Sequence, residues 1–274
     1  MKATQASLEH PDWRAMTSFF LRSRGLQAQR LVRNALRRLP RLAGGAAEDF
    51  PCVLAESVSP LHTSSDPREH LLVLGKIENL RLACRRLHHR VLEPNEVFSL
   101  WRQLGPPWRL RGFVPGREVR EGCVIPTFGG GLCQLSGSLL EVATAVDLDL
   151  LEIHRHTALP ADVPRDPRRD ATLFWNYVDL RFRSRVPLLF ECFLSRTALV
   201  VRLRDKQPGS ASVQIGDGIA GKVSPLPLTV SGSCLTCDQT ECARHVADAF
   251  KIAKTAFLLD EYQPEFARRV RDYI

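Results

Sequence analysis

The sequence predicts an α+β fold with a mixed or antiparallel sheet, and three observations support this prediction. Apolar residues recur at helical spacing through residues 68–90. Residues 173–182 and 187–203 alternate or run apolar, as strands do. Between these regions, a glycine-rich loop leads into a second apolar-periodic helix that carries a cysteine. Because strands and helices do not alternate regularly along the chain, a parallel sheet with helical crossovers is not expected.

The composition divides the 274 residues into four regions. Residues 1–45 form a basic, partly amphipathic segment, and residues 50–205 form the main domain. Residues 206–233 are a linker rich in Gly, Ser and Pro, and residues 234–274 hold a Cys/His knuckle and a helix. A chain that is 44% hydrophobic and 25% charged can bury one full core and still carry such appendages.

Most of the net charge of +8 lies in the first region, where nine Lys or Arg residues precede Gly44 against only Glu9 and Asp12. The apolar residues between Leu26 and Leu42 are partly helical in spacing. A basic amphipathic helix can bind an anionic membrane surface or nucleic acid. Nucleic acid fits least, because aromatic residues do not alternate with the arginines. The alternative is a solvated helix that packs on the domain through its leucines.

The compartment predicted from the sequence is the cytoplasm, with the protein either free or on the inner face of the membrane. No run of about 18 apolar residues occurs, which is the length a spanning helix needs. The apolar run 19–21 is too short for a signal peptide and is followed by Arg22 and Arg24. Eight cysteines with one tight grouping fit a reducing compartment better than a disulfide framework.

The sharpest chemical signal is a cysteine that follows three glycines. Gly129, Gly130 and Gly131 precede Leu132 and Cys133 at the expected start of a helix. Glycine allows close approach of the backbone, and a helix N-terminus stabilises a thiolate and a developing oxyanion. The pattern predicts a nucleophilic cysteine with a pKa below the usual value. The alternative is a small buried residue after a tight turn.

A cysteine nucleophile needs a base and a group that orients the base. His154 and His156 follow the helix by one short apolar run, and on a strand their spacing would put both on one face. Asp170 is the candidate that orients the base or stabilises its charge. Backbone N–H groups after the glycines, with the Gln134 amide as an extra donor, are candidates for an oxyanion hole. The alternative for the histidines is simple exposure.

A second chemical site is expected near the C-terminus. Four potential ligands occur there as Cys-x2-Cys-x4-Cys-x2-His, namely Cys234, Cys237, Cys242 and His245. Two such pairs close together can hold one tetrahedral ion, which favours a structural zinc. An iron–sulfur cluster is the alternative cofactor, since closely spaced cysteines also suit it.

Several further motifs occur in order on both sides of the glycine loop. They are Glu93–Ser99, Gly105, Gly112–Phe113, Gly116–Glu118, Glu152–Thr157 and Asp170–Thr172. Together with the run Gly-Gly-Gly-Leu-Cys-Gln, they resemble the VanW family over about residues 59–203. Two positions depart from the family pattern: Asn95 stands where the family has glycine, and Ile153 stands where it has arginine. His156 matches the family's histidine.

The resemblance implies a protein linked to peptidoglycan metabolism and to accessory functions in antibiotic resistance. It also implies thiol-dependent acyl transfer similar to that of L,D-transpeptidases, or hydrolysis, on a peptide or cell-wall precursor through Cys133. The alternative is a non-catalytic module that binds a cell-wall or polysaccharide precursor and carries a structural metal site. Transpeptidation of finished wall takes place outside the membrane, whereas the predicted compartment is the cytoplasm. An unusual export signal, a cytoplasmic precursor as substrate, or the binding module would each resolve this conflict.

Overall fold

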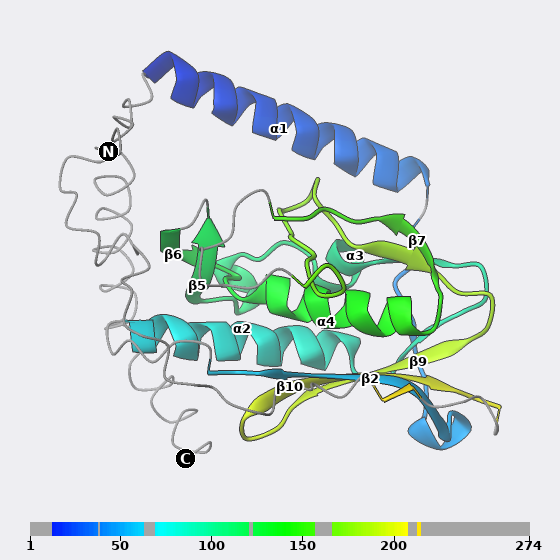
Figure 1. Ribbon diagram of the computed structural model, residues 1–274. Helices are drawn as coiled ribbons and strands as arrows, with labels where there is room; N and C mark the ends of the chain where they lie inside the picture. The colour runs from blue at the N-terminus through cyan, green and yellow to red at the C-terminus, as the bar shows by residue number, and fades with distance from the viewer. Residues whose placement is uncertain are drawn as a thin grey trace, which may run out of the picture.

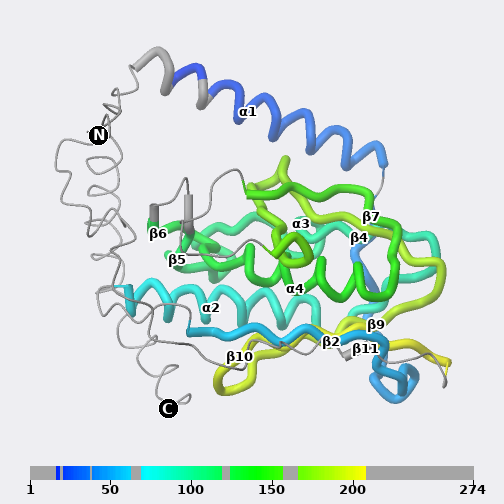
Figure 2. The backbone as a smooth tube through the Cα atoms, in the orientation of Figure 1, coloured from blue at the N-terminus to red at the C-terminus, as the bar shows by residue number. Residues whose placement is uncertain are grey.

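The computed structural model describes residues 13–37, 39–62, 69–120, 123–156, 166–207 and 213–214. Within them the fold is α+β with largely antiparallel sheets, which confirms the predicted class. The elements form layers: one sheet, then a pair of helices, then two small sheets, with a long outer helix beyond them (Figure 1). The same path is visible in the backbone tube, where that outer helix crosses the top of the molecule (Figure 2).

The largest sheet, sheet A, contains six strands in the order β1-β3-β9-β10-β2-β11. Its neighbouring strands are antiparallel except for β11, which runs parallel to β2. The bounds are β1 Ala43–Gly44, β2 Cys52–Pro60, β3 Arg90–Leu92, β9 Leu188–Leu194, β10 Ala198–Asp205 and β11 Val213–Gln214. The strands expected in 187–203 are therefore confirmed as the β9–β10 pair at the centre of the sheet.

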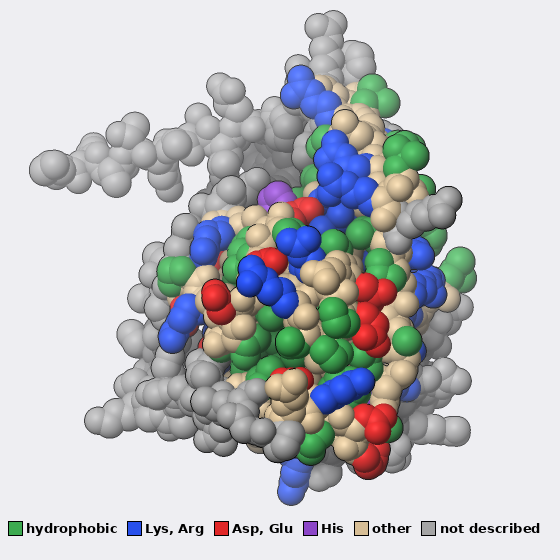
Figure 3. All heavy atoms as spheres, turned by 90° about the vertical axis from the view of Figure 1, so that its right-hand side faces the viewer, with side chains coloured by type: hydrophobic (Ala, Val, Ile, Leu, Met, Phe, Trp, Pro, Cys, Tyr) green, Lys and Arg blue, Asp and Glu red, His purple; other side chains and the backbone are tan. Residues whose placement is uncertain are grey.

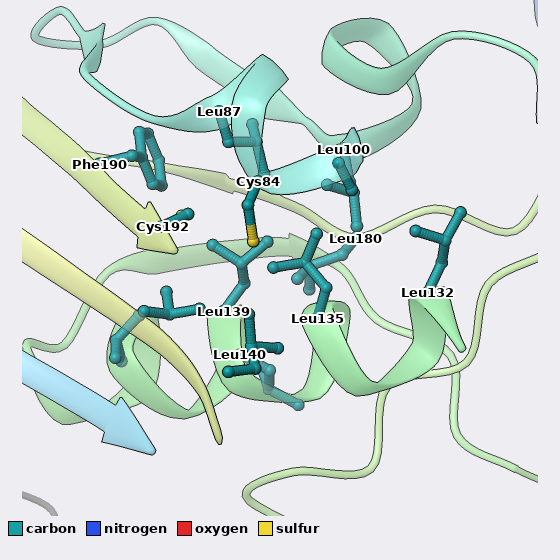
Figure 4. Packing of buried hydrophobic residues seen from close by; sticks show 14 of the residues in the cluster. Cys84, Leu87, Leu100, Leu132, Leu135, Leu139, Leu140, Leu180, Phe190 and Cys192 are labelled. Carbon is teal, nitrogen blue, oxygen red and sulfur yellow. The ribbon is translucent and has the colours of Figure 1, made fainter. Parts of the chain in front are cut away.

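Two helices cover one face of sheet A (Figure 1). Helix α2, His70–Leu87, packs against β9, and α4, Leu132–Ala145, packs against β2 and β10. Leu135, Leu139 and Leu140 of α4 meet Cys84 and other residues in a continuous apolar core (Figure 4). Leu135 and Leu139 are fully buried there. The core fixes the start of α4, and therefore the position of Cys133, against the rest of the domain.

Two smaller sheets complete the domain. Sheet B has the order β4-β8-β7, and sheet C is the hairpin β5–β6. The bounds are β4 Val97–Ser99, β5 Pro115–Arg120, β6 Cys123–Phe128, β7 Asp149–Glu152 and β8 Arg181–Arg183, with helix α3 at Leu100–Leu104 and short 3₁₀ turns η1 at Ala47–Asp49 and η3 at Arg109–Arg111. The left-handed turn at Asn95, with φ 66°, precedes β4. Asparagine tolerates this conformation, so it can take the place of the family's glycine.

The strand expected over residues 173–182 is wrong for most of its length. Only Arg181–Arg183 forms a strand, whereas Phe174 and Val178 make an isolated bridge across a tight turn. Asp179 explains the break, because its buried carboxylate accepts hydrogen bonds from the Ser99 hydroxyl and the Trp101 backbone N–H. A buried carboxylate needs such partners, and they hold this segment out of a regular strand.

The outer helix α1 spans Trp13–Leu36 and contacts the domain through polar groups. The Gln27 amide donates to the carbonyl oxygen of Trp175 at 2.9 Å, and Arg30 pairs with Glu152. The leucine-mediated packing considered as an alternative fails within α1, where Leu26, Leu31 and Leu36 are exposed and the residues that dock are Gln27, Arg30 and Asn34. It holds just beyond the helix, where Leu39 and Leu42 are buried. No helix in the described part of the chain is both long enough and apolar enough to span a bilayer.

Candidate functional site

The site begins where hairpin β5–β6 turns into helix α4. Gly129 and Gly131 have φ angles of 78° and 98°, which L side chains rarely adopt. A Cβ on Gly131 would lie 2.1 Å from Cγ of Lys76, so the side chain of Lys76 occupies the space beside the loop. The Asn79 amide donates to the Gly130 carbonyl at 3.0 Å and fastens the loop to α2. Helix α4 begins at Leu132, immediately after this turn.

Cys133 is the second residue of α4, and its thiol faces the segment 170–173. Its Sγ lies 3.9 Å from Oγ1 of Thr172, and the backbone N–H of Leu173 hydrogen bonds to it. Burial, followed by the carboxylate of Glu118, raises the pKa of Cys133 to about 11. The expected depressed pKa is therefore wrong, because desolvation and nearby negative charge outweigh the helix N-terminus.

His156 and Asp170 form a tight pair, and Asp170 lies on the segment that faces this thiol. His156 Nδ1 lies 2.6 Å from Asp170 Oδ1, and the His156 backbone N–H donates to the same oxygen at 3.0 Å. Asp170 also lies close enough to Cys133 for its charge to raise the pKa of the thiol. A carboxylate bonded to Nδ1 holds the proton there and leaves Nε2 as the ring's acceptor. This is the arrangement that a histidine base requires.

Helix α4 and the Asp170 segment are fastened together directly. The Ser136 hydroxyl donates to the carbonyl of Ala171 and also approaches the carbonyl of Cys133. Gly137 packs so closely that a Cβ there would lie 2.4 Å from the Arg169 carbonyl oxygen. The helix that carries Cys133 and the segment that carries Asp170 are therefore packed directly against each other.

Two candidates lie elsewhere. His154 is exposed, with its Nε2 3.2 Å from Glu152, within the cluster that docks α1. Its expected placement beside His156 fails because β7 ends at Glu152, so strand alternation does not extend to either histidine. The Gln134 amide donates to the Ser59 hydroxyl at 2.9 Å and to the Pro60 carbonyl at 2.8 Å. Gln134 therefore anchors α4 to β2, and its N–H groups do not serve an oxyanion hole.

The backbone N–H groups at the start of α4 are the other candidate donors for an oxyanion hole. The N–H of Leu132 donates to the Gly129 carbonyl, and that of Gln134 donates to the Gly131 carbonyl. Within the described residues, no backbone carbonyl accepts from the N–H of Gly131 or of Cys133. These two groups lie at the positive end of the helix, where a negatively charged oxygen is stabilised.

The sequence analysis missed Lys76, Glu118 and Thr172 as members of the site. Burial, followed by the charge of Arg117, lowers the pKa of Lys76 to about 7. Arg117 pairs with Glu69 at 2.8 Å. A usable signal existed for Lys76, because it lies in line with the apolar residues Val73 and Leu80 of the buried helix face. Glu118 and Thr172 lie in two of the motifs named above, but their approach to Cys133 arises only through the tertiary fold.

The expected metal ligands Cys234, Cys237, Cys242 and His245 lie outside the described residues. Among the residues that are described, no group of three or more His, Cys, Asp or Glu side chains is placed to hold a metal ion. The site around Cys133 is thus built from a thiol, a histidine–aspartate pair, a carboxylate and backbone donors.

Comparison with known proteins finds similarity to VanW-like proteins over the part of the chain that holds the site. The model of VanW-like proteins matches residues 75–204. The chain is 29% identical over 132 residues to the protein YoaR of Bacillus subtilis, covering 48% of this chain and 40% of that protein. It is 25% identical over 175 residues to the vancomycin B-type resistance protein VanW of Enterococcus faecalis, covering 62% and 63% of the two chains.

No solved structure matches the chain. The chain spans less than two thirds of either relative, so the likeness concerns the shared domain. The matched range 75–204 begins within α2 and ends near the end of β10. It includes the glycine loop, Cys133, His156 and Asp170. Through this domain, the chain is similar to VanW-like proteins.

Proposed function

We propose that this domain transfers an acyl group from a cell-wall peptide, with Cys133 as the nucleophile. The resistance function named for the Enterococcus relative suggests peptidoglycan or its precursor as the substrate class. The observation that carries the proposal is the His156–Asp170 pair, 2.6 Å apart, whose aspartate lies on the segment that faces the thiol. The reaction is transpeptidation similar to that of L,D-transpeptidases, or hydrolysis when water is the acceptor.

The raised pKa of Cys133 requires the proton to leave the thiol as the bond to carbon forms. His156 Nε2 accepts this proton while Sγ attacks the donor carbonyl, and Asp170 stabilises the resulting imidazolium. The peptide C–N bond then breaks, the leaving amine takes the proton from His156, and a thioester remains on Cys133. An acceptor amine or water attacks the thioester, its proton passes through His156, and the thiol is restored.

The oxyanion formed in both steps needs donors. The backbone N–H groups of Gly131 and Cys133 are the candidates, because within the described residues neither donates to a backbone carbonyl. The N–H groups of Leu132 and Gln134, in contrast, already donate to loop carbonyls. Donors of this type contribute roughly 10²- to 10³-fold to the rate. The glycines that hold the loop open are therefore part of the proposed machinery.

Four variants test the proposal with a synthetic stem peptide as donor and a free amine as acceptor. Cys133→Ser should abolish turnover and the thioester intermediate, whereas the matched control Cys52→Ser should retain both. His156→Ala should slow the reaction by roughly 10²- to 10⁴-fold. His154→Ala, its control, should have little effect. Intact-mass spectrometry detects the thioester intermediate, and chromatography quantifies the product. Undiminished turnover by Cys133→Ser would rule the nucleophile out.

One observation favours a second candidate, a module that binds the precursor without reacting. A thiol with a pKa of about 11 is almost wholly neutral at pH 7, which removes the usual advantage of a cysteine nucleophile. Calorimetry separates the two candidates. A binding module would bind the stem peptide equally well as wild type and as Cys133→Ala, and the wild type would yield no product.

The metal site stays a proposal of its own. We expect Cys234, Cys237, Cys242 and His245 to bind one structural zinc ion, with an iron–sulfur cluster as the alternative. Elemental analysis of the purified chain should find about one zinc per protein. Cys237→Ser should lose the metal and leave the alkylation of Cys133 unchanged. Metal-free wild-type protein would contradict this proposal.

A further inference from the structure

Helix α1 turns its polar side toward the domain. Gln27 donates to the Trp175 carbonyl at 2.9 Å, and Arg30 donates to the Tyr177 carbonyl at 3.1 Å and pairs with Glu152. Asn34 accepts from Arg181 at 2.8 Å. These three residues follow one another at intervals of three and four, so they share one face of the helix.

The opposite face of α1 is apolar and open to solvent. Leu21, Val32 and Leu36 are 63%, 60% and 79% exposed, and Leu26 and Leu31 are also exposed. Leu21 and Val32 lie about three turns apart and therefore point the same way. An ordinary surface helix has the reverse arrangement, with its apolar face against the core. The exposed leucines consequently need another explanation.

Arginines flank this apolar face. Arg22 and Arg33 are exposed and also lie about three turns apart, beside Leu21 and Val32. Helix α1 contains neither aspartate nor glutamate. In the space-filling view, Lys and Arg side chains lie beside hydrophobic ones at the top of the described molecule, where α1 runs (Figure 3). The outer side of the helix thus combines apolar side chains with positive charge.

We propose that α1 lies on an anionic lipid bilayer, with Leu21, Val32 and Leu36 inserted among the acyl chains. Their side chains would leave water for the boundary of the acyl region, while the arginines beside them bind lipid phosphates. The positive charge favours an anionic lipid surface over a second copy of the chain as the partner, because two copies of this arginine-rich face repel one another. The polar contacts to Trp175, Tyr177 and Glu152 hold the domain on the other side of the helix.

Membrane binding would fix the orientation of the domain. Helix α1 contacts β7 and the turn at 174–178, so this side of the molecule would face the lipid and sheet A would point away (Figure 1). The proposal does not depend on the chemistry of Cys133. A binding assay with lipid alone therefore tests it separately from the proposed reaction.

Flotation of the full chain with vesicles tests the proposal. Binding is expected to vesicles of phosphatidylglycerol and phosphatidylcholine, to weaken with added salt, and to be slight for pure phosphatidylcholine. The double variant Arg22→Gln, Arg33→Gln should weaken binding by roughly fivefold for each arginine. Val32→Ser with Leu36→Ser should weaken it roughly tenfold or more.

Matched controls come from exposed residues far from α1 in the sequence. Leu110→Ser removes a leucine that is 96% exposed, and Arg196→Gln removes an exposed arginine in the turn between β9 and β10 of sheet A, so both should bind like the wild type. All replaced side chains are at the surface, and circular dichroism should show unchanged folding. Equal binding to anionic and neutral vesicles, or no binding, would overturn the proposal. Self-association that Val32→Ser with Leu36→Ser abolishes, without lipid binding, would assign this face to a second copy instead.

Discussion

Opposing effects act on the thiol of Cys133. A helix N-terminus stabilises an adjacent anion by about 0.3–1 kcal/mol. Burial and the carboxylates of Glu118 and Asp170 raise the pKa from 9.0 to about 11. Each pKa unit corresponds to about 1.4 kcal/mol, so the destabilisation of the thiolate by burial and negative charge exceeds its stabilisation by the helix N-terminus. The site therefore holds its thiol neutral and leaves proton removal to a base.

Glu118 should control the reactivity of Cys133. Removing this carboxylate lowers the cost of the thiolate, so Glu118→Gln should lower the pKa of Cys133 and speed its alkylation at pH 8 roughly three- to tenfold. The exposed Glu93→Gln should change nothing. Iodoacetamide labelling over a pH series, with mass spectrometry to identify Cys133, measures the effect. An unchanged profile would exclude Glu118 as a cause of the raised pKa.

Lys76 should make the stability of the fold depend on pH. Its pKa is about 7 in the folded protein and about 10.5 when unfolded, so the unfolded chain binds one more proton between these values. The free energy of unfolding therefore rises with pH across this window. Lys76→Met should be more stable than the wild type at pH 7, by on the order of 1–4 kcal/mol, with the difference shrinking toward pH 10.

Urea unfolding at several pH values measures this difference. Lys206→Met, which replaces an exposed lysine, is the control and should follow the wild type at every pH. A constant offset between Lys76→Met and the wild type would mean that Lys76 keeps its charge throughout.

At the scale of elements, the decisive contact joins α4 to the segment that carries Asp170. Ser136 bonds to the Ala171 carbonyl, and Gly137 lets the Arg169 backbone approach. The sequence shows only an apolar-periodic helix here, with a glycine and serines of no evident purpose. The fold gives them one, because the Ser136 hydrogen bond and the missing side chain of Gly137 bring the segment that carries Asp170 against α4.

Two glycine substitutions should have opposite effects. Gly137→Ala would place a Cβ 2.4 Å from the Arg169 carbonyl oxygen, so it should cost roughly 1–3 kcal/mol of stability and slow acyl transfer. Gly25→Ala in α1 meets no atom within 4 Å and should stabilise the helix by roughly 0.5–1 kcal/mol. Denaturant unfolding compares them. Equal effects of the two would contradict the close packing at Gly137.

For the whole molecule, one core connects sheet A, α2, α4 and sheet B. Leu139 of α4, Leu87 of α2, Phe182 of β8 and Phe190 of β9 are all fully buried in it. Because the elements share these contacts, the domain should unfold as one cooperative unit. The outer helix α1 adds polar contacts to this unit but contributes none of its described side chains to the core.

Leu139→Ala should lower the free energy of unfolding by roughly 2–5 kcal/mol, because it leaves a cavity between α4 and its neighbours. Tryptophan fluorescence and far-ultraviolet circular dichroism should report the same transition midpoint. Leu110→Ala, at a fully exposed position, should change stability by less than about 0.5 kcal/mol. Separate midpoints for the two probes would indicate that the layers unfold independently.

The fold class, strands β9 and β10, helix α2 and the resemblance to VanW-like proteins could all be predicted from the sequence alone. Each of these depends on local periodicity or on contiguous motifs, which a single chain displays directly. The pairing of His156 with Asp170 was only a proposal from residue type and order, and the structure supplies its 2.6 Å geometry. Asn95 stands where the family has glycine, and the structure shows a turn with a positive φ at this position.

The electrostatics of the thiol and the orientation of α1 could not be predicted from the sequence, because both depend on contacts between distant segments. The pKa of Cys133 depends on burial and on Glu118, which is fifteen positions away in the chain and belongs to β5. The leucines of α1 have helical spacing whichever way they face, so the sequence could not tell which side meets the domain. That choice followed from partners on distant segments, Trp175, Glu152 and Arg181, because hydrogen bonds and charge pairs form between residues that the fold brings together.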